Sequence, residues 1–363
     1  MHRILTVIGA RPNFVKAAIV SKALKSVPNL VETVVHTKQH NSPEMTQALV
    51  AELGMDYPTL LPEPFAMTSA ERLGNMIYYL SHYIHDRKHY GESYPNYIMV
   101  YGDTDSTLVG ALVARKMGIP IIHVEAGLRS YNPVMQEESN RILVDHMSDI
   151  LFAPTQAAMR NLQHEHLQGI HMVGDVMYDA SLYYSKLMDG CTVINKFKLT
   201  PSHYYLATIH RAETVDDEHT LKIVIKAFRH LAEYMPVVLP MHPRTRQALD
   251  KFGISTEGLT VIPPASYVEM QVLEKNAVLI LTDSGGVQKE AYFHKVPCVT
   301  LRLQTEWSEL VNSGWNFLLS EITEEAILSA VASPFKKMSV DDYGDGHASE
   351  KIAAIINKLL NKG

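Results

Sequence analysis

The sequence predicts an α/β protein made of two Rossmann-like domains that face each other across a cleft. Short β-rich segments alternate with longer amphipathic stretches along the whole chain, a pattern typical of βαβ units and parallel sheets. Most of the short segments are continuously apolar, as strands covered on both faces of a sheet are. A chain of 363 residues is also longer than a single hydrophobic core usually supports, so two domains are expected.

Six strands are expected in each half of the chain. In the first half they cover residues 4–9, 32–37, 97–103, 120–125, 149–154 and 170–174. In the second half they cover residues 204–210, 237–242, 259–263, 277–283, 297–301 and 316–319. The stretches between them have helical spacing, and Pro12 fits the first turn of the first helix. The tail, residues 349–360, indicates one more helix.

The expected domain boundary lies at Gly174, after the last strand of the first half. The sequence predicts an N-terminal domain over residues 1–173, a C-terminal domain over residues 174–348 and a terminal helix within residues 349–363. Gly174 could be a hinge, or it could simply form a tight turn between a strand and a helix.

Composition excludes several classes of protein. The chain is 46% hydrophobic and 20% charged, and its net charge of -6 includes no long run of one sign, so neither nucleic acid nor a membrane surface is an expected partner. Cys191 and Cys298 form no CxxC pair, and the histidines show no HExxH spacing, so no disulfide or metal is expected. No apolar stretch spans a bilayer, and the run at residues 4–8 is too short for a signal peptide, which favours the cytoplasm.

Three carboxylates lie where predicted strands lead into loops. Asp103 and Glu125 each end a buried strand, and Glu137 follows in a polar segment. Acids at the carboxyl ends of parallel strands converge on the crevice where open α/β sheets bind ligands. Carboxylates that lie close together can differ in pKa, which suits proton transfer near neutral pH. Three such acids beside Gly-rich turns favour an acid/base site over helix capping and solvated loop charge.

Two strand-to-helix turns have the composition of an anion site. Ser284, Gly285 and Gly286 open a predicted helix, whose free amides suit a phosphate, and Ser284 could also cap that helix. The alternative is an ordinary Gly-containing turn, because the segment matches neither a Walker loop nor GxGxxG. At the first strand, Arg11 and Lys16 place positive charge at a helix N-terminus, against the helix dipole, and an anionic ligand would compensate for it. An ordinary turn without a ligand explains this segment equally well.

Further polar residues follow strands of the second half. His210 with Arg211, and His242 with Arg244, could neutralise a diphosphate, although a single strand-end histidine is more often structural. In the segment from residue 301 to 307, other polar side chains could hold a sugar against Trp307. The first residues of an ordinary helix, with Thr305 as its N-cap, would explain that segment equally well.

Taken in order, these segments resemble the non-hydrolysing UDP-N-acetylglucosamine 2-epimerases over nearly the whole chain. The likeness is carried by Gly9-Ala10-Arg11-Pro12 with Lys16, Gln39-His40, Gly102-Asp103-Thr104, His123-Val124-Glu125-Ala126-Gly127-Leu128-Arg129, Glu137-Glu138 with Asn140-Arg141, His210-Arg211 with Glu213, Asp283-Ser284-Gly285-Gly286 with Gln288 and Glu290, and Thr305-Glu306. Members of that family share the two-domain GT-B fold of many nucleotide-sugar glycosyltransferases and are usually homodimers. Their C-terminal helix crosses back onto the first domain.

The resemblance implies a role for each group of residues. Asp103, Glu125 and Glu137 would be the acid/base carboxylates, and His210 would assist near the diphosphate. Phosphate would be held by Ser284, Gly285 and Gly286 with Arg11 nearby, ribose by Glu290, and uracil at the position of Met270. The other expected substrate-binding residues are Lys16, Arg141, Arg211, His242, Arg302, Thr305 and Glu306. No metal or redox cofactor is implied.

The implied reaction inverts C2 of a UDP-2-acetamido sugar. UDP-N-acetylglucosamine would become UDP-N-acetylmannosamine by loss and re-addition of UDP through a glycal. The segments at residues 127–132, 242–245 and 305–307 look closer to a branch that acts on UDP-2,3-diacetamido-2,3-dideoxy-glucuronic acid, where Arg244 could meet the sugar carboxylate. The competing interpretations are a GT-B glycosyltransferase, a hydrolysing epimerase and a catalytically silent nucleotide-sugar sensor.

The chain also departs from the family pattern. Lys38 replaces a usual Gly, Gln136 a usual Pro and Thr214 a usual Asn. The loop between Arg129 and Glu137 is shorter than in the typical UDP-N-acetylglucosamine enzymes, many of which are activated by substrate at a second site lined partly by this loop. The resemblance therefore does not extend to such activation.

Overall fold

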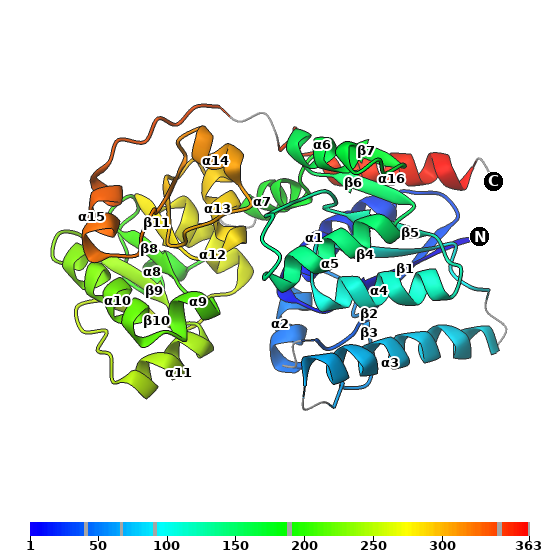
Figure 1. Cartoon of the computed structure of the whole chain (residues 1–363), viewed down its shortest axis with the longest axis horizontal. Helices are drawn as coiled ribbons and strands as arrows, with labels where there is room; N and C mark the ends of the chain where they lie inside the picture. Colours follow the sequence, from blue (N-terminus) through cyan, green and yellow to red (C-terminus); the bar gives the residue numbers. More distant parts are fainter. Residues whose placement is uncertain (40–42, 66–67, 90–92, 187–190, 340–342, 362–363) are drawn as a thin grey trace. The chain divides into compact units, whose positions relative to one another are not determined.

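A computed structural model describes residues 1–39, 43–65, 68–89, 93–186, 191–339 and 343–361 of the chain (Figure 1). The chain divides into two compact units. Unit 1 comprises Met1–Ala180 with Asp342–Gly363, and unit 2 comprises Ser181–Asp341. The division falls inside helix α7 (Val176–Ser185), shortly after the predicted turn at Gly174.

Unit 1 contains a parallel sheet of seven strands in the order β3-β2-β1-β4-β5-β6-β7. Its elements in chain order are β1 (His2–Ile8), α1 (Arg11–Leu24), β2 (Leu30–His36), α2 (Pro43–Leu53), β3 (Thr59–Leu60), α3 (Ser69–His89), β4 (Tyr97–Tyr101), α4 (Asp105–Lys116), β5 (Ile121–Val124), α5 (Gln136–Met147), β6 (Ile150–Ala153), α6 (Gln156–His164), β7 (Ile170–Met172), α7 and α16 (Ala348–Leu360). Six strands lie where the sequence predicts them. Strand β3 is additional, because a two-residue strand leaves no periodic pattern to detect.

Unit 2 contains a second parallel sheet, of six strands in the order β10-β9-β8-β11-β12-β13. Its elements in chain order are α8 (Val193–Lys196), β8 (Tyr205–Thr208), α9 (Ala212–Val215), α10 (Glu218–Ala232), β9 (Val237–Pro240), α11 (Pro243–Phe252), β10 (Thr260–Ile262), α12 (Tyr267–Lys275), β11 (Leu279–Thr282), α13 (Gly285–Phe293), β12 (Cys298–Thr300), α14 (Ser308–Asn312), β13 (Asn316–Leu318) and α15 (Glu324–Ala332). All six predicted strands are present, so the predicted pair of parallel α/β sheets is confirmed.

Burial explains why the apolar segments form strands. Every residue of β4 from Ile98 to Tyr101 is fully buried, as is usual for a central strand with helices on both faces. In unit 2, helix α10 buries Leu221, Val224, Ile225 and Phe228, which share one helical face. These side chains pack with β8, β9 and β11 in one apolar cluster, which fixes the sheet under the helix.

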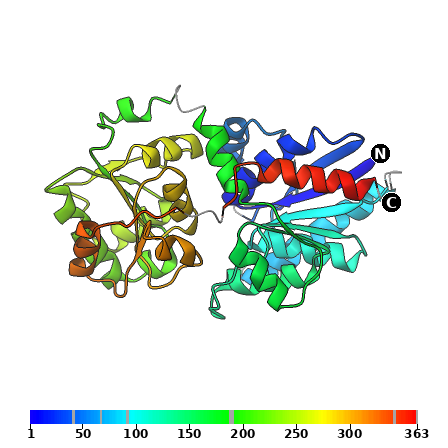
Figure 2. The same cartoon turned by 90° about the horizontal axis from the view of Figure 1, so that it is seen from above.

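The C-terminal helix α16 packs against α1 and belongs to unit 1 (Figure 2). Asp179 on α7 accepts hydrogen bonds from the amides of Ala348 at 3.0 Å and Ser349 at 2.7 Å. A carboxylate in that position accepts hydrogen bonds from the amides at the start of the helix. Its negative charge also interacts favourably with the helix dipole. The tail is therefore attached to unit 1 at its first turn and along its apolar face.

Strand order shows where each sheet is built to bind a ligand. In both sheets the first strand, β1 or β8, lies beside the fourth, β4 or β11, and the chain runs outward on either side of them. Ligands of such doubly wound sheets bind outside the carboxyl ends of the strands at this reversal point. Ligands are therefore expected near the turns after β1, β4 and β5 in unit 1, and near those after β8, β9 and β11 in unit 2.

Candidate active site

The turn after β4 presents Asp103 with its carboxylate held by an arginine. Gly102 has a positive φ of +66°, which turns the chain sharply at the end of the strand. Asp103 Oδ2 accepts a hydrogen bond from Arg141 Nη2 at 2.5 Å, and the Asp103 carbonyl accepts one from Asn140 at 3.0 Å. The Asp103 side chain stays 30% exposed, so it is oriented by α5 and still reachable from solvent.

The turn after β5 presents Glu125, paired with Lys16 of α1. Both side chains are nearly enclosed, and Lys16 Nζ donates to Glu125 Oε2. A methyl group on Gly102 would lie 3.2 Å from Lys16 Nζ and 3.3 Å from Glu125 Oε2, so the turn that carries Asp103 lies directly against this ion pair. The structure thus brings together three of the predicted site residues of unit 1.

The turn after β1 supplies Lys16 but leaves Arg11 exposed. The sequence left open whether an anionic ligand compensates these two cations, and for Lys16 the structure supplies Glu125 as the opposite charge. The turn is held by Asn13, whose side-chain oxygen accepts from the amide of Ala10 at 3.1 Å and the hydroxyl of Thr104 at 3.2 Å. Asn13 therefore joins the turns after β1 and β4.

A second set of contacts supports the same edge of the sheet. Gln39 Oε1 accepts hydrogen bonds from the amide of Ser106 at 3.0 Å and from its hydroxyl at 2.7 Å. A methyl group on Gly9 would collide with Ser106 Oγ at 1.8 Å, so only glycine fits there. His40, which accompanies Gln39 in the family motif, lies outside the described residues.

Two adjacent glutamates in the first turn of α5 have different surroundings. Glu138 is buried and accepts hydrogen bonds from the amides of Ser130 and Tyr131, each at 2.8 Å, and from Arg141 at 2.9 Å. Glu137 is partly exposed. Arg141 therefore links Asp103 to Glu138, and Glu138 in turn holds the start of the loop between Arg129 and Glu137.

In unit 2, the turn after β11 gathers polar atoms around two glycines. Ser284 occupies the N-cap position of α13, but its side chain makes no capping hydrogen bond, which corrects the prediction that it caps this helix. Instead, the Ser284 amide donates to Thr282 Oγ1 at 2.9 Å. A methyl group on Gly286 would have Ser284 Oγ at 3.9 Å and Glu290 Oε2 at 4.0 Å as its nearest neighbours, so the predicted phosphate and ribose residues surround one point.

The segment before α14 lies against the other glycine of this turn. A methyl group on Gly285 would come within 2.8 Å of Glu306 Oε1, and Trp307 Nε1 donates to the Gly285 carbonyl at 2.9 Å. Arg302 pairs with Glu306 at 3.2 Å. Thr305 is not an N-cap, because α14 begins at Ser308. Its hydroxyl donates to Gln288 of α13 at 2.7 Å, which ties the segment to the glycine-containing turn.

The turn after β8 is fixed to the same place by a buried acid. Asp283 is fully buried, and its carboxylate accepts hydrogen bonds from the amides of His210 at 2.9 Å and Arg211 at 3.0 Å. The rings of His210 and His242 lie 5.2 Å apart. The backbone of His210 and Arg211 is therefore held beside the turn that contains Ser284, and His242 lies next to His210.

Arg244 has a protein partner of its own. Its guanidinium donates two hydrogen bonds to Asp216, from Nε at 3.0 Å and from Nη2 at 2.5 Å. These bonds raise the pKa of Arg244 and lower the pKa of Asp216. The arginine that sequence reasoning offered to a sugar carboxylate is thus already paired.

Helix α12 borders the same turn through its first residues. Met270 is partly buried and packs against the apolar cluster that includes Val287 of α13. Burial raises the pKa of Tyr267 well above its usual value, and the nearby negative charge of Glu290 raises it further. Tyr267 therefore keeps its proton and remains a hydrogen-bond donor beside the predicted ribose site.

Sequence reasoning missed the buried acids that hold these turns, chiefly Asp145 in unit 1 and Asp283 in unit 2. Asp145 shares one helical face with Glu138 and Arg141, and all three are buried. A polar stripe at helical spacing beside a predicted site was a usable signal for it. Asp283 directly precedes Ser284, which was the corresponding signal in unit 2.

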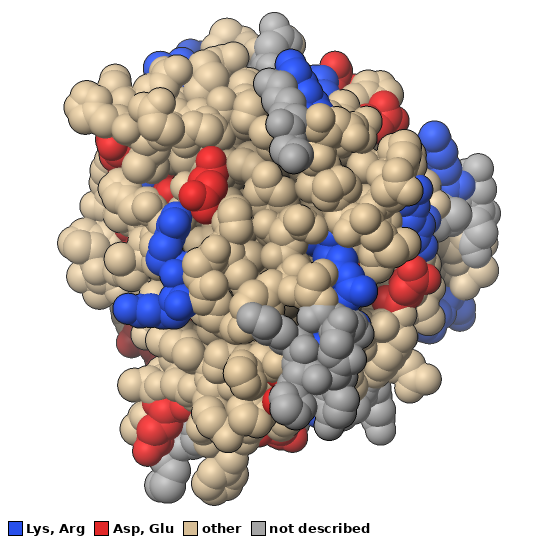
Figure 3. Space-filling view, turned by 90° about the vertical axis from the view of Figure 1, so that its right-hand side faces the viewer, with Lys and Arg blue, Asp and Glu red and all other residues tan. Residues whose placement is uncertain are grey.

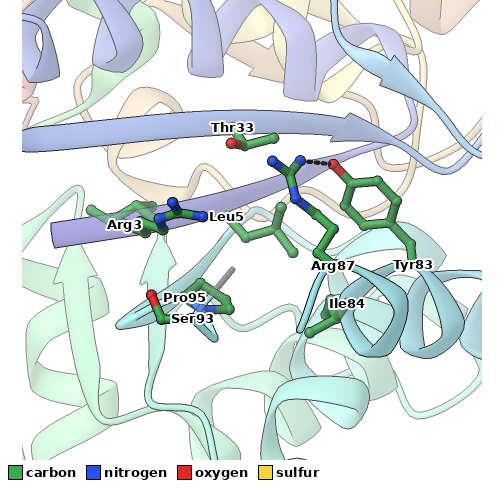
Figure 4. Close-up of a pocket in the computed structure, with 9 residues that line it drawn as sticks. Arg3, Leu5, Thr33, Tyr83, Ile84, Arg87, Ser93 and Pro95 are labelled. Carbon is green, nitrogen blue, oxygen red and sulfur yellow. Dashed lines mark hydrogen bonds between the residues drawn. The ribbon is translucent and has the colours of Figure 1, made fainter. Parts of the chain in front are cut away.

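Other surface features do not coincide with these turns. A groove at the amino end of β1 is lined by Arg3, Thr33, Tyr83 and Arg87, and Arg87 donates to the Tyr83 hydroxyl at 2.5 Å (Figure 4). None of the predicted site residues lines this groove. On the face in Figure 3, basic and acidic side chains are interspersed rather than separated by sign. Among the described residues, no helix is both long and apolar enough to cross a membrane, and no group of three His, Cys, Asp or Glu is placed to hold a metal ion.

Comparison with known proteins gives matches over nearly the whole chain. Residues 22–357 match the family model described as UDP-N-acetylglucosamine 2-epimerase. A UDP-2,3-diacetamido-2,3-dideoxy-D-glucuronate 2-epimerase of Pseudomonas aeruginosa is 42% identical, covering 98% of this chain and 100% of that protein. A UDP-N-acetylglucosamine 2-epimerase of Methanocaldococcus jannaschii is 36% identical, covering 96% of this chain and 97% of that protein.

Solved structures agree with these relatives. The crystal structure of the Methanocaldococcus jannaschii UDP-GlcNAc 2-epimerase in complex with UDP-GlcNAc and UDP has a TM-score of 0.88 at 36% identity and covers 98% of this chain and 99% of that one. UGT2 of Phytolacca americana, complexed with UDP-2fluoro-glucose and pterostilbene, has a TM-score of 0.60 at 12% identity and covers 99% of this chain and 94% of that one, a likeness of fold alone. The predicted GT-B-like fold is thereby confirmed.

Proposed function

From the premise that this chain belongs to the UDP-N-acetylglucosamine 2-epimerase family, and is thus a UDP-sugar 2-epimerase, we propose how its residues invert C2 of a UDP-2-acetamido sugar. One carboxylate removes the C2 proton while UDP leaves C1, which produces a glycal and enzyme-bound UDP. UDP then adds back to C1 as a proton reaches the opposite face of C2. Sugar and UDP stay joined in the product, as in the non-hydrolysing branch of the family.

The observation that carries this proposal is the group of carboxylates in unit 1. Inversion needs acid/base groups on two faces of one carbon, and Asp103, Glu125 and Glu137 offer them from different elements. Arg141 orients Asp103, and Lys16 compensates the charge of the buried Glu125. We assign no separate acid and base among the three.

We assign the leaving diphosphate to unit 2. The amides at the start of α13, the hydroxyl of Ser284 and the side chain of His210 would stabilise the charge that develops on UDP. The family resemblance also gives Arg11 a role in phosphate binding. Arg211, His242, Arg302, Thr305 and Glu306 would complete the nucleotide-sugar site, with Glu290 at the ribose and Met270 at the uracil.

Two substrates are candidates, and similarity favours the second. UDP-N-acetylglucosamine is the substrate named for the family and for the 36% identical relative. The diacetamido-glucuronate nucleotide is named for the 42% identical relative, which matches over its full length. In this chain the Arg244 guanidinium is bound to Asp216, so recognition of the sugar carboxylate would have to come from another cation or from opening of that pair.

The deciding experiment follows C2 directly. The protein is incubated in deuterated water with each nucleotide sugar in turn, and the products are observed by NMR. Deuterium at C2 with UDP still attached is the expected result, and the sugar that exchanges faster is the substrate. Free UDP with unlabelled sugar would instead indicate transfer or simple hydrolysis, and free UDP with C2-deuterated sugar would indicate a hydrolysing epimerase. Absence of exchange with both sugars would remove the proposal. Light scattering tests the homodimer expected for the family.

A further inference from the structure

One buried carboxylate joins two of the strand-end turns of unit 1. Asp145 on α5 is fully buried, and its two oxygens have different partners. Oδ1 lies 2.7 Å from His123 Nδ1, and Oδ2 accepts a hydrogen bond from the Gly127 amide at 3.0 Å. On the other side of the imidazole ring, His123 Nε2 lies 2.7 Å from the carbonyl oxygen of Gly102. A continuous path of hydrogen bonds thus runs from the turn after β4 to the turn after β5.

Both ring nitrogens of His123 have a partner. Nε2 lies against the carbonyl oxygen of Gly102, which can only accept a hydrogen bond, so a donor is needed at that position. Nδ1 lies against Asp145 Oδ1, and Asp145 Oδ2 also accepts a hydrogen bond from Arg129 Nη1 at 2.7 Å. Contacts on both sides hold the His123 ring in one orientation.

Two carboxylates surround the buried guanidinium of Arg129. Arg129 continues the path, donating from Nε and from Nη2 to the two carboxylate oxygens of Glu165, each at 2.7 Å. Burial alone would lower the pKa of Arg129, but Glu165 and Asp145 raise it above its usual value. Arg129 therefore lies between Asp145 and Glu165, which compensate its buried charge.

We infer that His123 and Asp145 are positioning residues that fix the separation of the two strand-end carboxylates. Asp103 directly follows the glycine whose carbonyl His123 holds, and Glu125 lies two residues before the glycine whose amide Asp145 holds. Both positioning residues are fully buried, so they act through these turns and not on the sugar. The inference rests on the proposed function, because the separation matters for proton transfer on two faces of one carbon.

Two substitutions of His123 separate its two contacts. The amide nitrogen of glutamine reaches the place of Nε2, whereas that of asparagine reaches the place of Nδ1. His123→Gln therefore keeps a donor for the Gly102 carbonyl, and His123→Asn keeps only the contact with Asp145. We expect His123→Asn to lower the rate of C2 deuterium exchange about 10- to 100-fold, since misplacing a reacting group by about 1 Å can cost that much. His123→Gln should stay within about tenfold of the unmodified protein.

A second measurement needs no turnover. Backbone hydrogen exchange, followed by mass spectrometry, should be faster over residues 101–105 in His123→Asn than in His123→Gln, with UDP affinity the same in both. Asp145→Leu should accelerate exchange over residues 125–129 as well. The inference is overturned if both His123 variants lose turnover alike, or if neither changes exchange over residues 101–105. An unmodified protein without C2 exchange would refute the proposed function, and the hydrogen-exchange comparison would still decide whether His123 fixes the turn.

Discussion

The ammonium group of Lys16, in the first turns of α1, forms a shielded ion pair with the carboxylate of Glu125, at the end of β5. Glu125 itself has a φ of +70°, a conformation that costs a non-glycine residue roughly 1–2 kcal/mol. The strain and the buried charge are both held by the surrounding fold. Such strain is commonly retained where the orientation of a side chain matters for function.

Removing one partner of this pair should destabilise the protein strongly. Lys16→Met leaves the Glu125 carboxylate buried without its compensating charge, and we expect a loss of about 3–5 kcal/mol in the free energy of unfolding. Urea denaturation measures it. The double variant Lys16→Met with Glu125→Gln has no charge at either position and should recover much of that stability. It should show no C2 exchange, because the proposed acid/base group Glu125 is missing. An unchanged urea midpoint in Lys16→Met would show that the pair does not stabilise the folded state.

The adjacent glutamates of α5 should respond differently to the same substitution. Glu137→Gln should lower turnover about 100-fold or more and leave stability unchanged, because a general acid or base contributes about 10²–10⁴ in rate. Glu138→Gln should lower stability by about 1–3 kcal/mol, since the amides of Ser130 and Tyr131 lose a charged acceptor. Thermal unfolding and C2 exchange, measured on both variants, test the distinction. If Glu137→Gln keeps normal turnover, Glu137 is not part of the proton transfer.

Strand positions could be predicted because parallel strands are covered on both faces and so appear as continuous apolar runs. The same rule placed Asp103, Glu125 and His210 at strand ends, where the structure has them. It could not detect β3, whose two residues pair with β2 without a pattern of their own. Helix capping was harder to predict than strand position. Serine is a common N-cap residue, but the sequence does not show whether the hydroxyl of Ser284 makes the capping hydrogen bond.

Contacts between residues that lie far apart in the sequence could not be predicted from it. Lys16 and Glu125 lie 109 residues apart in the sequence, and nothing in either segment indicates that their side chains form an ion pair. The same holds for Asp283 and the amide of His210, since a backbone donor leaves no mark in the sequence. The type of each residue could be read from the chain, but which acid receives a ligand and which acid holds a turn depends on burial.

Stability should fall as pH drops, in part through His294 of unit 2. Burial, with a smaller contribution from Lys275, lowers the pKa of His294 to about 4, against 6.5 for the ordinary side chain. Between these values the unfolded chain binds a proton that the folded one excludes, so stability decreases as pH falls from about 6.5 to about 4 and is unaffected above that range. The loss is at most about 3 kcal/mol, because each pKa unit of difference between the folded and unfolded states corresponds to about 1.4 kcal/mol.

The control for this prediction is His294→Gln, which removes the titrating group. Urea denaturation of both proteins at several pH values should give a shallower pH dependence for the variant, and the two curves should run parallel above about pH 6.5. Parallel curves at every pH would show that His294 does not contribute. Gln271, which lies 3.0 Å from His294 Nε2, should still find an amide partner in the variant.

Alanine substitutions at the two glycines after Ser284 should distinguish a steric effect on stability from an effect on UDP binding. Gly285→Ala places a methyl group 2.8 Å from Glu306 Oε1, so Glu306 must move, and we expect a loss of about 1–3 kcal/mol in stability together with weaker UDP binding. Gly286→Ala meets nothing closer than 3.9 Å, so its stability should be unchanged. If a phosphate approaches this backbone, the second methyl group should nevertheless weaken UDP binding about tenfold or more. Calorimetric titration measures the UDP affinity of each variant, and thermal unfolding measures its stability. Unchanged UDP affinity in Gly286→Ala would show that the diphosphate does not bind at this turn.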